Sequence, residues 1–148
     1  MTTTLTRSPT ADRTTRDQPT SRVYTALIAL SGVAILLQGL WAGIFLGRSA
    51  DGKGESSWLD VHARGGEVAL VLTALATIAG FVLARRRRDL WIGSAALSVL
   101  LALEAWIGGL IHDSGKNTLT AIHVPLAMAI LGLSVWLLVR SRRTTPRA

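Results

Sequence analysis

Four long apolar runs constrain this chain more than any other feature of its sequence. They cover residues 23–46, 61–84, 90–111 and 121–139, and most of the charged residues lie between or outside them. Each run is long enough to cross about 30 Å of hydrocarbon as a tilted helix, which takes roughly 20 residues. Because a helix satisfies its own backbone hydrogen bonds in lipid, the runs predict an all-α integral membrane protein.

The composition agrees with a protein that contacts the lipid bilayer. Hydrophobic residues make up 49% of the chain, although the net charge of +7 would also suit a nucleic-acid-binding protein. The arginines cluster beside the apolar runs and do not alternate with aromatic residues, so we expect no nucleic-acid partner. The chain has no cysteine, which excludes disulfides, thiolate metal sites and haem attached through cysteine.

The connections and ends of the chain predict its domain organisation. Short connections favour an up-down-up-down four-helix bundle, which we place over residues 22–140. Residues 1–21 are rich in Thr, Ser, Arg, Asp and Pro and predict a disordered tail, because they contain too little apolar surface to bury. Residues 141–148 form a short basic tail.

The distribution of basic residues predicts how the bundle is oriented. Twelve of the sixteen lie before the first run, between the second and third, or after the fourth, and four lie on the other side. Positively charged segments stay in the cytoplasm, so we expect both termini to be cytoplasmic in a cell (plasma) membrane. The excess of Arg over Lys, with abundant Ala, Gly and Leu, indicates a bacterial source. The basic residues on the cytoplasmic side are Arg7, Arg13, Arg16, Arg22, Arg85, Arg86, Arg87, Arg88, Arg140, Arg142, Arg143 and Arg147.

Two histidines occupy matching places in this predicted topology. His62 opens the second run and His123 opens the fourth, so both are expected near the outer surface. The second and fourth helices of such a bundle are diagonal, with axes roughly 11–14 Å apart if neighbouring axes are about 8–10 Å apart. That separation suits two imidazoles that bind a b-type haem from opposite faces. The alternative is that both are interfacial residues near the lipid headgroups.

Residues near the histidines suggest how such a haem could be accommodated. Gly65, Gly66 and Ala127 would leave room for the porphyrin edge, and Arg64 could pair with a propionate. His112 is a further candidate, as an alternative ligand, a proton carrier or simply the first polar residue of a loop.

A zinc site is a competing interpretation of the same histidines. It would combine His62, His112 and His123 with Asp113 or Asp60. Zinc takes four such ligands in tetrahedral geometry. The pair of ligands four residues apart on one helix is missing, so haem is the preferred interpretation.

Two polar residues lie inside the apolar runs. Glu104 is seven positions before Ile111, about 10 Å from the outer end of its helix, and Gln38 lies at a similar depth. Intramembrane acids usually face a bundle interior, a cavity or a proton path. Glu104 and Gln38 therefore predict either a contact for a proton or quinone headgroup, or a hydrogen bond between a protonated Glu104 and Gln38 that joins two helices.

Glycines recur in the first run at four-residue spacing. Gly39, Gly43 and Gly47 would lie along one helix face, and small residues mark the faces where membrane helices pack. The stripe predicts packing within the bundle, or contact with a second copy or a larger membrane complex.

The histidine placement resembles one four-helix half of haem A synthase. Each half of that family has a histidine at the outer start of its second and fourth helices, and these positions correspond to His62 and His123. Gln38-Gly39-Leu40 is similar to the first-helix pattern of the family. The chain also resembles small four-helix bacterial membrane proteins with the same histidine placement. It differs from haem A synthase in having one bundle and no cysteine pair.

Two hypotheses follow. The first is a membrane protein that binds b-type haem near the outer face, for electron transfer or haem handling. The second is a cofactor-free structural or assembly subunit. A transporter is less favoured because the bundle has little polar lining, and no nucleophile–base arrangement indicates a hydrolase.

Overall fold

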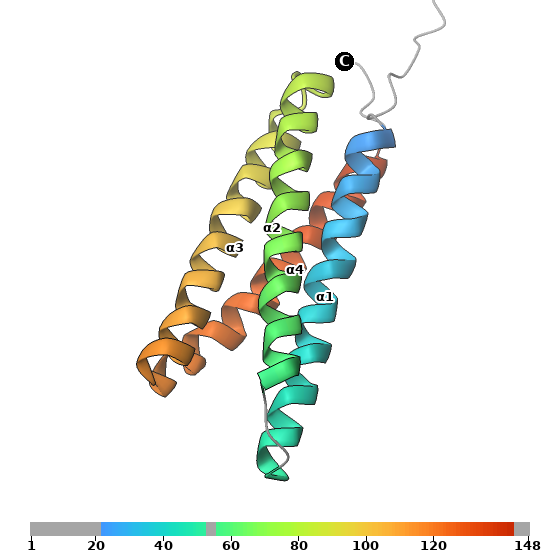
Figure 1. The fold of residues 1–148 in the computed structure, drawn as a ribbon. Helices are drawn as coiled ribbons and strands as arrows, with labels where there is room; N and C mark the ends of the chain where they lie inside the picture. Colours follow the sequence, from blue (N-terminus) through green and yellow to red (C-terminus); the bar gives the residue numbers. More distant parts are fainter. Residues whose placement is uncertain (1–21, 53–55, 144–148) are drawn as a thin grey trace, which may run out of the picture.

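The computed structural model describes residues 22–52 and 56–143. Within them the chain forms four long helices and no strand, which confirms the all-α prediction. The helices are α1 (Arg22–Ala50), α2 (Ser56–Leu83), α3 (Arg88–Ser114) and α4 (Thr120–Arg142), and a short 3₁₀ helix, η1 (Asn117–Leu119), precedes α4. Successive helices run in opposite directions, so that α1 begins and α4 ends at the same end of the bundle (Figure 1).

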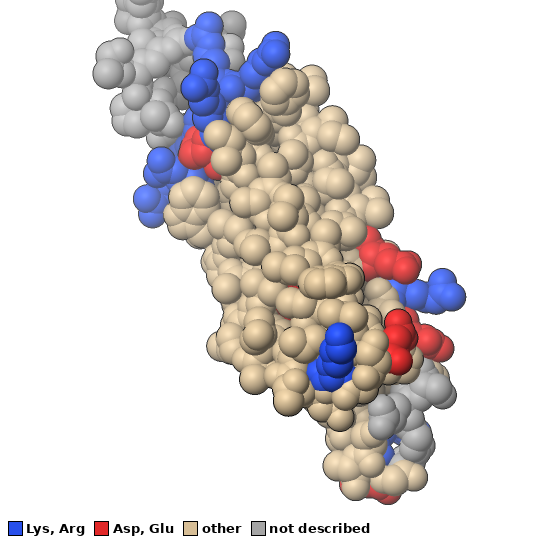
Figure 2. All heavy atoms as spheres, turned by 90° about the vertical axis from the view of Figure 1, so that its left-hand side faces the viewer, with Lys and Arg blue, Asp and Glu red and all other residues tan. Residues whose placement is uncertain are grey.

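The helices form a square in which α2 lies diagonally opposite α4. Each helix packs against its neighbours in sequence, and α1 also packs against α4, whereas neither diagonal pair of described helices makes a close backbone contact. The end with Arg85–Arg88 is called the arginine end, and the end with His62 and His123 is called the histidine end. Lys and Arg side chains gather at the arginine end, and charges of both signs mix toward the other (Figure 2).

The outer surface of the bundle is apolar on all sides. Each helix contains a strongly apolar window long enough to cross a membrane, and only 17–28% of the residues in these windows are buried inside the bundle. A helix that is apolar all round, yet mostly uncovered by protein, needs lipid as its solvent. The chain is therefore a multi-pass membrane protein, built from four helices that contact the bilayer.

The interior of the bundle is narrow and contains several hydroxyl groups. Most of them are satisfied locally, since Ser31, Ser94 and Ser98 each donate to the carbonyl oxygen four residues earlier, at 2.8–3.0 Å. Tyr24, fully buried in α1, reaches across the bundle to α3, where its hydroxyl lies 2.9 Å from Ser94 Oγ and 3.2 Å from the Leu90 carbonyl oxygen. Tyr24 thus joins α1 to α3, and each of the serine hydroxyls named here has a hydrogen-bond acceptor within its own helix.

A charged cluster fastens α3 and α4 together at the arginine end. Asp89, in the first turn of α3, pairs with Arg87 at 3.1 Å and with Arg140 of α4 at 3.0 Å. The Arg87 guanidinium also donates to the carbonyl oxygens of Arg140 and Arg143 at 3.1 and 3.3 Å. Carbonyls at a helix C-terminus have no partner within the helix, so Arg87 caps α4.

The helices extend beyond the apolar runs that predict them. α1 continues four residues past residue 46, and α2 begins five residues before residue 61, so His62 lies in the second turn of α2 and not at its start. α3 runs to Ser114 and includes His112, which was expected in a loop or at its boundary. It ends where Gly115 adopts a left-handed conformation, φ 63°. The predicted tail over residues 1–21 lies outside the described residues.

Candidate functional site

His62 is held by α1 through one nitrogen of its ring. Its Nδ1 lies 3.2 Å from the backbone carbonyl oxygen of Gln38, and the edge of the ring meets Phe45 with centroids 5.6 Å apart. A carbonyl oxygen can only accept, so Nδ1 must donate the proton of this bond. An uncharged His62 therefore carries its free lone pair on Nε2, which is the usual nitrogen for binding a metal.

His123 is held in a similar way by α3. It lies in the opening turn of α4, as predicted, and its Nδ1 is 3.1 Å from Oε1 of Glu104. The two atoms are within ion-pair distance, yet their alignment does not satisfy hydrogen-bond geometry. We describe this pair as an electrostatic contact, because Coulomb attraction depends on separation far more than on angle. The Nδ1 side of the His123 ring thus faces a carboxylate.

The two histidines lie at the same end of the bundle. His62 is near the start of α2 and His123 near the start of α4, and these two helices make no close backbone contact. The diagonal placement of their helices therefore agrees with the structure, and the equal depth of the two imidazoles stays a prediction. Each ring has its Nδ1 turned toward an acceptor on an adjacent helix, so Nε2 takes no part in either contact.

Buried polar atoms without hydrogen-bond partners gather between these side chains. Among the described residues they include Oε1 of Gln38, both carboxylate oxygens of Glu104 and Nδ1 of His123. Burying such atoms unpaired is costly, and each one in a native structure calls for an explanation such as a water, an ion or a ligand. This end of the interior therefore contains polar groups whose hydrogen bonding is incomplete among the described residues.

The expected hydrogen bond between Gln38 and Glu104 is not formed in the described part of the chain. The Gln38 amide donates instead to the carbonyl oxygen of Ala34, at 3.4 Å, and Glu104 lies beside His123. Glu104 is 8% exposed, so its placement in the bundle interior agrees with the sequence prediction. The partner of Glu104 is therefore a histidine and not an amide.

Gly65, one of the residues proposed to make room for a haem, lies against side chains of α1. A Cβ atom at Gly65 would overlap the Trp41 ring and the Gln38 amide, so Gly65 admits side chains of α1. At Gly66 the nearest such contact is Oε1 of Gln38, at 3.9 Å. Arg64 is exposed and lies about 200° around α2 from His62, since each helical residue turns by about 100°. Arg64 does not share the face of His62.

The described residues contain no group of three or more His, Asp or Glu side chains that could hold a metal ion. His112 and Asp113 are exposed in the last turn of α3, and Asp60 is exposed on α2. The zinc interpretation, which needs these residues beside His62 and His123, therefore has no ligand set. A haem needs only two protein ligands, so this finding does not bear on it.

The contact between Glu104 and His123 was not predicted from the sequence. Glu104 lies ten residues before the end of α3, a rise of about 15 Å. The three residues of η1 and the first turn of α4 rise about 12 Å in the other direction. The short polar connection between α3 and α4 could have predicted this contact. If the connection is helical, its rise brings His123 close to the level of Glu104.

Comparisons of the chain with protein families, curated proteins and solved structures give no match.

Proposed function

We propose that this protein binds a b-type haem between α2 and α4 at the histidine end, with His62 and His123 as the axial ligands. The observation that carries the proposal is the shared orientation of the two rings. Each Nδ1 faces an acceptor on the adjacent helix, the Gln38 carbonyl oxygen at 3.2 Å or the Glu104 carboxylate at 3.1 Å. Partners of this kind orient a metal-binding imidazole and make it more basic.

The donor set fits a haem, and the chemistry that a bound haem would supply is one-electron transfer. His62 and His123 would hold the iron through Nε2, and the Gln38 carbonyl and Glu104 would fix the rings. Glu104 is buried, so its negative charge beside His123 would favour the oxidised, more positive centre. Electron transfer or haem handling is the role that these properties support.

The proposal includes the location of the site. The arginine-rich turn and the described ends of the chain lie together, so the positive-inside rule favours cytoplasmic termini. The histidine end would then face the outer surface of a bacterial plasma membrane. The resemblance to one half of haem A synthase implies the same placement of the two histidines.

Absorption spectroscopy tests the haem proposal directly. The protein is expressed with ample haem, purified in detergent and recorded as a reduced-minus-oxidised spectrum. The wild-type chain should give sharp haem bands, and His62→Ala and His123→Ala should each remove or alter them. His112→Ala is the matched control, because His112 is exposed in α3 and should leave the spectrum unchanged. A wild-type protein without haem bands contradicts the proposal.

A second candidate function is that of a structural subunit that packs against another membrane protein or a second copy of itself. Gly39, Gly43 and Gly47 lie on α1, and no described atom comes within 4 Å of a Cβ atom added at any of them. By contrast, added Cβ atoms at Gly80 and Gly93 would crowd side chains of neighbouring helices. Gly39, Gly43 and Gly47 are thus not used for packing inside the bundle. Glycines at this four-residue spacing favour the close approach of another helix.

Replacement of Gly39 and Gly43 by Leu tests the second candidate. The added side chains would fill open space without disturbing the bundle, so the chain should stay folded while any association through this face is lost. Native mass spectrometry from detergent would measure the oligomeric state. Gly132→Leu is the control, since a Cβ at Gly132 in α4 also meets no described atom. An oligomer that survives the double change contradicts this assignment of the interface.

A further inference from the structure

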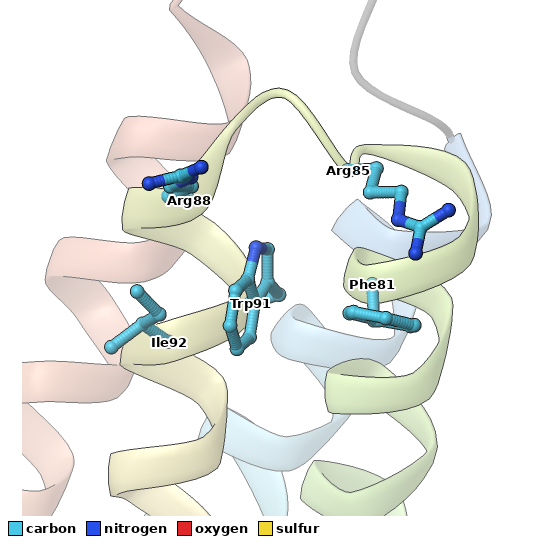
Figure 3. A pocket seen from close by; sticks show the side chains of 5 residues that line it. All are labelled: Phe81, Arg85, Arg88, Trp91 and Ile92. Atoms are coloured by element: carbon cyan, nitrogen blue, oxygen red, sulfur yellow. The ribbon is translucent and has the colours of Figure 1, made fainter.

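A pocket of about 400 Å³ lies at the arginine end, far along the bundle from the histidines. It opens between the end of α2 and the start of α3, and Figure 3 shows its lining side chains on both sides of the turn that joins these helices. The lining residues are Phe81, Arg85, Arg88, Trp91 and Ile92. The pocket therefore combines aromatic and aliphatic groups with two cations.

The part of the pocket farther from the α2–α3 turn is apolar and continuous with the outer surface of the bundle. Phe81 and Trp91 meet edge to face, with ring centroids 5.6 Å apart and planes at 85°. Phe81 is 44% exposed and Ile92 is 50% exposed, so both also contact the surroundings of the helices. Because that surface contacts lipid, an acyl chain could follow it into the pocket.

The part of the pocket beside the α2–α3 turn is cationic, and no carboxylate among the described residues neutralises its charge. Arg85 lies over the Phe81 ring at 4.9 Å, and no carboxylate among the described residues pairs with Arg85 or Arg88. The nearby acid, Asp89, is already occupied by Arg87 and Arg140. Two guanidinium groups thus remain available for an anion.

A buried donor adds a second, independent observation. Nε1 of Trp91 is buried, although it has no hydrogen-bond partner among the described residues. Figure 3 shows the nitrogen side of this indole turned toward the α2–α3 turn, between Arg85 and Arg88. An indole N–H only donates, and it usually finds an acceptor when it is buried. Nε1 of Trp91 is thus an unpaired donor beside the cationic end of the pocket.

We infer that this pocket binds an anionic phospholipid of the leaflet at the arginine end. Its headgroup phosphate would lie between Arg85 and Arg88 and accept the Trp91 N–H, while an acyl chain would lie along Phe81 and Ile92. Basic pockets between membrane helices recognise anionic headgroups in this way, and guanidinium groups match phosphate oxygens in geometry. The apolar floor favours a lipid over a soluble phosphate. The inference does not depend on the proposed haem.

Native mass spectrometry with defined lipids tests this inference. The full chain is purified in detergent and offered phosphatidylglycerol or phosphatidylcholine with the same acyl chains. Wild-type protein should retain roughly 10- to 30-fold more of the anionic lipid, since each arginine near an anionic surface contributes a several-fold preference. The variant with Arg85→Gln and Arg88→Gln should lose most of this preference. Trp91→Phe should reduce it while keeping the aromatic contact with Phe81.

The matched control carries Arg86→Gln and Arg142→Gln, two exposed arginines at the same end that do not line the pocket. It should retain the wild-type preference. An equal loss in the control and in the pocket variant would mean nonspecific attraction to basic groups and would overturn the inference. Displacement of the lipid by an equal concentration of glycerol phosphate would also overturn it, because the site would then recognise a soluble anion.

Discussion

At the scale of single residues, the contact of Glu104 with His123 joins α3 to α4 inside the bundle. An ionised carboxylate inside a membrane protein is costly unless a cation or a proton accompanies it. Glu104 is 8% exposed and lies 3.1 Å from an imidazole, with both of its oxygens lacking hydrogen bonds. The polar ring of His123 beside the carboxyl group offsets part of this cost.

Glu104→Gln should raise the midpoint potential of the proposed haem and weaken haem binding by about 10-fold or more, because second partners of a metal-binding histidine have effects of that size. The change removes the negative charge beside His123 but keeps the shape of the side chain. A spectroscopic redox titration measures the potential. Glu67→Gln, at an exposed position of α2, is the control. An unchanged potential and affinity would show that Glu104 does not act on the haem.

The close approach of α1 and α2 depends on Gly65. A Cβ at this position would overlap Trp41 and Gln38, so Gly65→Ala should destabilise the protein by about 1–3 kcal/mol, as overpacking does. Thermal unfolding in detergent, followed by circular dichroism, would reveal this change. Gly39→Ala on the facing helix is the control, since it has open space and should cost nothing measurable. Equal effects at the two glycines would contradict the packing described here.

At the scale of elements, Tyr24 fastens the diagonal pair α1 and α3 at the arginine end. Its hydroxyl bonds with Ser94 and Leu90 in a fully buried environment. Tyr24→Phe should lower the unfolding free energy by about 1 kcal/mol, the typical net value of one hydrogen bond. The double change with Ser94→Ala should cost less than the sum of the two single changes, because the two hydroxyls are partners. Additive effects would mean that they do not interact.

The helices could be predicted from the apolar runs, but their ends could not. Hydropathy reports the length that lipid covers, whereas helices continue into polar residues such as Arg48 and Ser56. The depth of His62 and His123 followed from topology, because antiparallel order fixes which helix starts share an end. The side chains that contact these histidines could not be predicted in this way, because they depend on side-chain direction and on the rise of η1. Spacing alone therefore suggested Gln38 as the partner of Glu104, and the structure places His123 there.

At the scale of the whole molecule, the charges divide the bundle into two unlike ends. Arginines at one end pair with Asp89 and cap α4, while the other end contains the half-buried His62 and His123 and the buried Glu104. For a membrane protein with this asymmetry, the positive-inside rule predicts an orientation with the more positive end in the cytoplasm. The proposed haem and the proposed lipid would then lie toward opposite faces of the same bilayer.

Cysteine labelling in intact cells tests the orientation, and the chain is suited to it because it contains no cysteine. Lys116→Cys and Arg86→Cys place one thiol at each end, both at exposed positions. A membrane-impermeant maleimide should label the first in intact cells and the second only after permeabilisation. The reverse pattern would place the histidine end in the cytoplasm and overturn the predicted topology.

Electron paramagnetic resonance of the oxidised, haem-loaded protein tests the central claim most directly. Two axial imidazoles, from His62 and His123, should give a low-spin ferric signal, and removal of either ring in His62→Ala or His123→Ala should convert it to a high-spin signal or abolish binding. A wild-type protein that binds no haem would contradict the account. So would a signal that neither substitution changes.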